Sequence, residues 1–165
     1  LAANGPVPLI VPVVKGRGPK IKIKDLQISY DEDWQRNHWR TIFSAYNSSP
    51  FFEFYIDDLE PFFQKKYAFL LDLNMEILQT LTGLLEIEPK ILLTEDFEQV
   101  PEGTLNLREK IHPKIHNINE YKGIRFVEYT QVFSDKLNFA PNLSILDLLF
   151  NTGPQAYSII EDGIV

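Results

Sequence analysis

Apolar residues alternate with polar ones in several short stretches, and elsewhere they recur at helical spacing. The segments 8–14 and 21–30 are rich in Ile, Val and Leu and are joined by a loop containing Gly and Pro, which is typical of two β-strands. Similar patterns predict a third strand at 90–93 and a last one at 121–132. The sequence therefore predicts a small β-sheet.

Helical spacing predicts three further elements. Asp31 or Asp33 caps a helix that runs to about Asn47, where Pro50 stops it. A long helix is expected over 61–86 because leucines recur every three to four residues there. A shorter helix at 145–150 follows a Ser-x-x-Asp pattern that resembles a capping box, with another short helix after it. The expected fold class is α+β, a mixed small β-sheet packed against a long helix and several shorter helices.

One position interrupts the apolar stripe of the long helix. Asn74 lies where the helical period requires an apolar side chain. A buried amide must find hydrogen-bond partners or cost about 1–3 kcal/mol. We therefore expect Asn74 to be buried, and either to bond the 129–144 region or to line a pocket.

Length and charge limit the classes of partner. The 165 residues predict a single domain over 1–165, and the net charge of −7 argues against a nucleic-acid-binding protein. Five basic residues between Lys15 and Lys24 form either a local basic patch or a solvated loop that leads into an edge strand. The chain lacks cysteine and has no apolar run long enough for a membrane helix, so a cytoplasmic protein without a membrane span is expected.

The start of the chain raises a separate expectation. The sequence begins at Leu1 rather than Met, just before an Asn4-Gly5 turn, which suggests a missing natural N-terminal segment. The segment 8–14 is almost wholly apolar, yet Pro8 and Pro12 cannot donate to a sheet. We therefore expect an exposed apolar patch or an unpaired edge there, which a second copy of the chain could close in a homodimer.

The candidate chemistry centres on an aromatic block. Thirteen of the chain's 21 aromatic residues lie between Tyr30 and Phe69, where Gln35 and His38 stand among tryptophans. His38 is either a satisfied buried histidine or a general base, because imidazole titrates near neutrality. Trp34 and Trp39 are expected to be largely buried on two sides of their helix. The run 51–55 is alternatively a partner-facing aromatic patch.

Polar residues near the C-terminus form a second candidate group. Gln131, Asn142 and Ser144 lie around the start of the 145–150 helix. They are either turn and cap residues or ligands of a small anion at a helix N-terminus. His112 and His116 have a spacing known from zinc sites, but Pro113 separates them, so no metal site is expected. The sequence identifies no cofactor.

Several of these segments together resemble the WbqC-like family of bacterial proteins, in wording closest to its Bacteroidetes-type members. The resemblance covers nearly the whole chain. It rests on Asn4-Gly5 with the strand that follows, Lys24-Asp25-x-x-Ile28-x-Tyr30, Trp34-Gln35-x-x-His38-Trp39, the run from Ser44 to Phe52, Asn74, and the segment from Pro141-Asn142-Leu143-Ser144 to Gly153-Pro154. Family members usually carry an upstream aromatic, Asn- and Arg-rich motif that this chain lacks.

The resemblance implies a role in surface-polysaccharide (O-antigen) gene clusters, and a transferase of a small acyl group such as glycine. The first hypothesis is thus a transferase that binds a small-molecule substrate, such as a nucleotide sugar, with His38 as the general base. Gln35, Asn74, Gln131, Asn142 and Ser144 would bind the substrate. The second is a non-catalytic binding or assembly module. Convergence of His38, Asn74 and Gln131 in one pocket would favour the enzyme.

Overall fold

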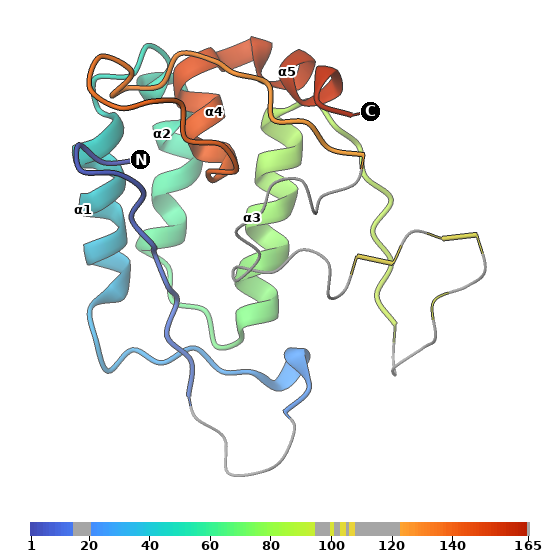
Figure 1. Ribbon diagram of the computed structural model, residues 1–165. Coiled ribbons are helices and arrows are strands. Elements are labelled where there is room, and N and C mark those ends of the chain that lie inside the picture. Colours follow the sequence, from blue (N-terminus) through green and yellow to red (C-terminus); the bar gives the residue numbers. More distant parts are fainter. Residues whose placement is uncertain (15–20, 95–99, 101–102, 105, 108–122, 165) are drawn as a thin grey trace.

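The computed structural model describes residues 1–14, 21–94, 100, 103–104, 106–107 and 123–164. Its described part is mainly helical: the three α-helices between Trp34 and Leu84 stand side by side, and the two between Ile145 and Asp162 lie across one end of them (Figure 1). The elements are η1 (Ile23–Asp25), α1 (Trp34–Tyr46), α2 (Phe52–Leu59), η2 (Glu60–Phe63), α3 (Leu70–Leu84), α4 (Ile145–Thr152), η4 (Gly153–Gln155) and α5 (Ala156–Asp162).

The predicted α+β fold is wrong, because the described residues contain isolated β-bridges but no strand. The segment 8–14 is extended and meets 21–30 at a single bridge, between Val13 and Ile28. Pro8 and Pro12 remove backbone donors, so a longer ladder cannot form along this segment. The segment 90–93 has no strand either, and the described part of 121–132 pairs only at Ile124 with Ile164.

The expected long helix over 61–86 is interrupted. A 3-10 turn ends at Phe63, and α3 begins only at Leu70. Between them the chain pairs with the N-terminal half: the Ile28 N–H donates to the Ala68 carbonyl, and the Leu70 N–H donates to the Leu26 carbonyl. These long-range hydrogen bonds hold Phe69 in an extended conformation. Tertiary pairing therefore outweighs the helical pattern of the sequence at this point.

The helix expected over 33–47 is confirmed as α1, whereas α2 was not predicted. The run 51–55 belongs to the core more than to a surface. Phe52 is 2% exposed and packs edge to face on Phe150, with ring centroids 5.0 Å apart. Within this run only Phe54 is an exposed aromatic, at 74%. Burying a phenylalanine contributes about 1.5–3 kcal/mol, so the run mainly stabilises α2 against α4.

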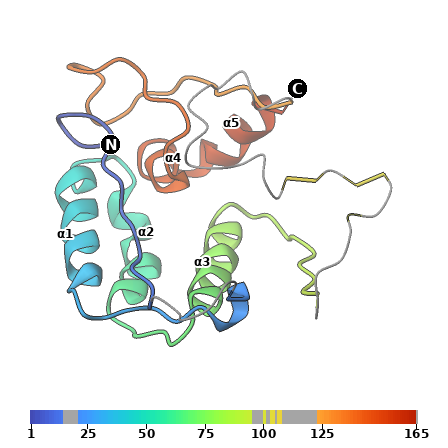
Figure 2. The ribbon, with the colours of Figure 1, turned by 60° about the horizontal axis from the view of Figure 1, so that its bottom comes forward.

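The N-terminal segment crosses the helices as an extended strap. Figure 2 shows residues 1–14 running along the layer formed by α1, α2 and α3. The strap is attached at its far end, where the Val14 N–H donates to the Gln27 carbonyl and the Ser29 N–H donates to the Pro12 carbonyl. Ile10 is 74% exposed, and Val7 and Val14 are also exposed. The predicted exposed apolar patch beside 8–14 is confirmed.

Gly153 ends α4 in a backbone conformation that other residues rarely adopt. Its φ is 55°, and a Cβ atom there would lie 2.4 Å from Cδ1 of Phe51. We expect Gly153→Ala to lower the free energy of unfolding by at least about 1–3 kcal/mol, since backbone strain adds to the clash. The matched change Gly83→Ala, in α3 with no atom near the new Cβ, should stabilise by about 0.5–1 kcal/mol. Urea unfolding of both variants tests this, and equal effects would contradict it.

Candidate functional site

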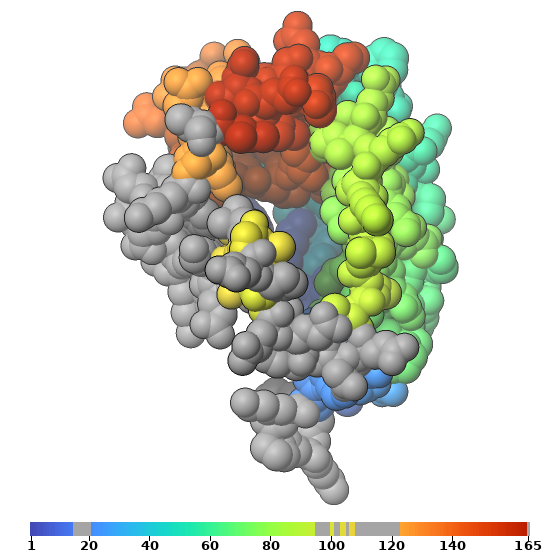
Figure 3. All heavy atoms as spheres, turned by 90° about the vertical axis from the view of Figure 1, so that its right-hand side faces the viewer, coloured from blue at the N-terminus to red at the C-terminus, as the bar shows by residue number. Residues whose placement is uncertain are grey.

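A cavity of about 360 Å³ lies under the N-terminal strap and between the helices. We call it the central cavity. Figure 3 shows the surface hollowed between α3 and the C-terminal helices, with N-terminal residues visible in its depth. Its wall is formed by the strap, α1, the end of α2, η2, α3 and the start of α4, and includes Leu9, Val11, Trp34, His38, Tyr46 and Leu73.

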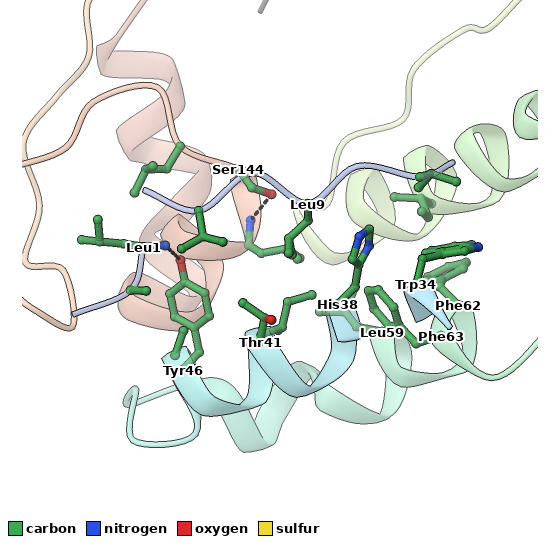
Figure 4. A pocket seen from close by; sticks show the side chains of 18 of the residues that line it. Leu1, Leu9, Trp34, His38, Thr41, Tyr46, Leu59, Phe62, Phe63 and Ser144 are labelled. Carbon is green, nitrogen blue, oxygen red and sulfur yellow. Dashed lines mark hydrogen bonds between the residues drawn. The ribbon is translucent and has the colours of Figure 1, made fainter. Parts of the chain in front are cut away.

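His38 is a polar group in this mainly apolar wall. It is 9% exposed and lies beside Trp34, with ring centroids 5.1 Å apart in an edge-on arrangement. The imidazole points from α1 towards the strap (Figure 4), where hydrogen bonding with the Ile10 backbone favours its charged form. Burial opposes this and is the larger effect, so the pKa of His38 is lowered from its ordinary value of 6.5. The ring is therefore mainly neutral at pH 7.

A buried carboxylate lies behind one end of the central cavity. Asp147 is fully buried, and it accepts hydrogen bonds from the hydroxyl groups of Tyr46 (2.7 Å) and Tyr129 (2.8 Å). The side-chain amide of Gln131 donates a third, at 2.9 Å. These contacts join α1 to the C-terminal part of the chain. We call the four residues the Asp147 cluster.

The two tyrosines of the Asp147 cluster remain protonated donors. Burial is the main cause that raises the pKa of Tyr46 far above its usual range, and the hydrogen bond to Asp147 adds to it. The pKa of Tyr129 is raised for the same two reasons in the same order. Tyr46 also lines the central cavity, so its hydroxyl connects the cavity wall to the carboxylate.

The structure separates the residues that the sequence assigned to one site. Asn74 is exposed on α3, next to buried Leu73, so the expected burial of Asn74 is wrong. Gln131 is buried in the Asp147 cluster, and its amide also bonds both backbone groups of Ala140. Neither residue lines the central cavity, whereas His38 does. The expected convergence of His38, Asn74 and Gln131 does not occur, so this argument for the enzyme hypothesis is lost and only His38 supports it.

The remaining predicted residues are mostly structural. Asn142 is exposed and has a φ of 56°, a turn conformation that asparagine tolerates. Ser144 is the N-cap of α4 and accepts a hydrogen bond from the Leu146 N–H at 3.4 Å, while also lining the central cavity (Figure 4). Asp147 does not complete a capping box, because its side chain turns inward to the tyrosines.

Gln35 connects α1 by hydrogen bonds to the end of η2 and to the residues that follow it. It is 8% exposed, and its side-chain nitrogen donates to the backbone carbonyls of Phe62 (3.0 Å) and Lys65 (2.7 Å). We expect Gln35→Leu to lower the free energy of unfolding by about 1–3 kcal/mol, because it leaves these carbonyls unpaired. The affinity for a ligand of the central cavity, measured at denaturant concentrations well below the unfolding midpoint, should stay unchanged. A selective loss of affinity in a stable variant would instead place Gln35 in the ligand site.

The two tryptophans differ in burial. Trp34 is 5% exposed and lines the central cavity. Trp39 is partly buried and stacks on Phe63, with ring centroids 5.3 Å apart. The predicted burial is thus confirmed for Trp34 and only partial for Trp39.

The described residues contain neither a cluster of metal ligands nor a helix that could span a membrane. Within them, no three His, Cys, Asp or Glu side chains are grouped so that they could hold a metal ion. His112 and His116 lie outside this part of the chain. No helix among the described residues has the length and apolar character to span a membrane.

Comparison with known proteins identifies the family. The chain matches the WbqC-like protein family over residues 1–119 and 109–159, and it therefore belongs to that family. It is also similar to the uncharacterized protein Rv1507c of Mycobacterium tuberculosis, with 27% identity over 175 residues. That alignment covers 90% of this chain and 73% of the relative. No solved structure matches the chain.

Proposed function

We propose that this WbqC-like protein is a transferase that moves a small acyl or aminoacyl group from an activated donor to a sugar precursor of a surface polysaccharide. The observation that supports it is His38, a neutral imidazole in the wall of the central cavity. A general base must be unprotonated at working pH and must be able to reach the reacting group. The pathway comes from the family resemblance, and His38 supplies the chemistry.

The proposed step is an acyl transfer from a thioester. A hydroxyl or amino group of the sugar attacks the carbonyl carbon of the donor while His38 removes the proton of that group. A new C–O or C–N bond forms, the C–S bond breaks, and the imidazolium returns the proton to the leaving thiolate. No net charge is left on His38, and no oxidant or metal ion is consumed.

The polar groups available for orientation differ from those expected. Thr41, Tyr46 and Ser144 line the central cavity together with His38. In this proposal they would contact the carbonyl group of the donor, whereas Gln35, Asn74 and Gln131 would have no substrate contact. Asn142 stays adjacent to Ser144 in sequence and has an exposed side chain.

The test is a transfer assay on the purified protein. A panel of coenzyme A thioesters and nucleotide sugars is incubated with the protein, and two products are followed. Released thiol is measured by colour reaction, and the mass gain of the sugar is measured by mass spectrometry. Both should appear together in a one-to-one ratio. Thiol release without acylated sugar would indicate hydrolysis, and the absence of both across the panel would refute the transferase.

A further inference from the structure

Apart from the α-amino group of Leu1, the wall of the central cavity carries no charge among the described residues. Among the described residues that line it, no side chain belongs to Asp, Glu, Lys or Arg. The α-amino group of Leu1 is paired with the buried Asp147 carboxylate, 3.9 Å away, and donates a hydrogen bond to the Tyr46 hydroxyl. It is therefore not free to neutralise a bound anion, and His38 is mainly neutral at pH 7. A phosphate or carboxylate placed inside would lose its hydration without gaining an ion-pair partner. The cavity therefore disfavours anions.

The size and the shape of the wall favour a chain-like apolar ligand. At about 30 Å³ per water molecule, 360 Å³ corresponds to roughly twelve water-sized groups. The apolar side chains come from opposite sides, with Leu9 and Val11 on the strap and Leu73, Ile77 and Leu81 on α3. Each methylene group that moves from water into contact with such a wall makes the free energy of binding more favourable. A nucleotide sugar, which is polar along its whole length, offers few such groups.

We infer that the central cavity binds a neutral acyl chain of medium length, presented by a thioester or ester, with its carbonyl end near His38 and its charged carrier outside. This inference rests on the proposed function for the role of His38, but it concerns binding. It replaces the small acyl or aminoacyl group of the proposed function by an uncharged aliphatic chain, because the ammonium group of an aminoacyl donor would lose its hydration in this wall. It also leaves the nucleotide of the acceptor outside this cavity, so that only the attacking group of the sugar reaches His38.

The chain contains a built-in reporter for this binding. It has two tryptophans, of which Trp34 lines the central cavity and Trp39 does not. In a Trp39→Phe variant, Trp34 is the only indole, so its fluorescence reports on the cavity wall. Titration with acyl coenzyme A thioesters of four to ten carbons should change this fluorescence saturably. Affinity should rise about fourfold per added methylene until the cavity is full. Coenzyme A alone, decanoate and a uridine diphosphate sugar serve as comparison ligands.

Two adjacent strap residues give a matched pair of variants in that background. Leu9 lines the cavity and is 40% exposed, whereas Ile10 is 74% exposed and its side chain does not line it. Both positions tolerate a polar residue because both reach solvent. Leu9→Glu should weaken binding of the decanoyl thioester at least tenfold, since an apolar contact is replaced by a carboxylate. Ile10→Glu should change it less than twofold.

The outcomes separate this inference from the proposed function. Saturable binding of the decanoyl thioester that is lost in Leu9→Glu alone supports the acyl-chain site, even if no transfer is ever detected. Equal binding of decanoate, or of the nucleotide sugar, at the Trp34 reporter would overturn it, even if transfer occurs. No fluorescence response to any chain length would also overturn it. Equal losses in both glutamate variants would show that the effect is not specific to the cavity wall.

Discussion

Asp147→Ala is expected to lower the free energy of unfolding by about 3–6 kcal/mol, the largest stability effect that we predict for a single substitution. The change removes the acceptor for the hydroxyl groups of Tyr46 and Tyr129 and for the amide of Gln131. A buried donor left without a partner costs about 1–3 kcal/mol. Because domains are stable by only about 5–15 kcal/mol, the variant should be close to unfolding at 37 °C.

Urea unfolding measures this loss, provided that the unfolding free energy depends on urea concentration with the same slope in each variant. Two comparison variants are needed. Asp135→Ala makes the same change at an exposed aspartate between Gln131 and Ala140 and should alter stability by less than about 0.5 kcal/mol. Asp147→Asn keeps one carbonyl acceptor and should lose less than Asp147→Ala. If alanine at 147 proves nearly neutral, the tyrosines must find other acceptors, and the cluster does not hold the C-terminal helices in place.

Double variants show whether the cluster acts as a unit. Tyr46→Phe and Tyr129→Phe each remove one donor while keeping the ring. In the Asp147→Ala background each change should lower the free energy of unfolding by less than it does in the native protein, because the acceptor of the hydroxyl group is already absent. Coupling of about 0.5–3 kcal/mol is usual for residues in one hydrogen-bond network. Simple additivity would mean that the three contacts are independent.

The elements that could be predicted are those whose stability is local. The 33–47 helix has an acidic start, a regular buried face and a proline stop, and it forms as α1. The 145–150 helix forms as α4 behind its Ser144 cap. Extended apolar segments such as 8–14 have no comparable local signal. A strand forms only when another segment pairs with it, and the sequence does not specify that segment. Strands were therefore inferred where only single bridges exist.

The candidate site shows the same limit. His38 could be found from the sequence because its neighbours are tryptophans, and it does line the cavity. Asn74 could not be placed, since a shift of one residue moves a side chain from the buried face, where Leu73 lies, to solvent. The sequence pattern assigns Asp147 to a capping box at the start of the 145–150 helix. The useful clue was its position within an apolar run, three residues before the fully buried Phe150.

His38→Gln is expected to reduce the transfer rate by about 10²- to 10⁴-fold, the range that a lost general base typically costs. Glutamine keeps a hydrogen-bond donor for the Ile10 backbone but cannot accept a proton, so the fold should be preserved. Binding of the decanoyl thioester should weaken far less than the rate, because the acyl chain contacts mainly the apolar residues of the cavity wall. Arg40→Gln, on the exposed side of α1, is the matched control and should keep the native rate.

The pH dependence gives a second, independent readout of the same group. Because the pKa of His38 is lowered below 6.5 in the folded protein, the native rate should be constant from pH 8 to about 6.5 and should fall only at lower pH. The free energy of unfolding should also fall as the pH is lowered. Below about pH 6.5 the unfolded chain binds a proton at this position more readily than the folded one, so acidification favours unfolding. Both effects of His38 should be absent in His38→Gln. A native rate that already halves at pH 7, or one that does not fall on acidification while the protein stays folded, would show that this imidazole is not the base.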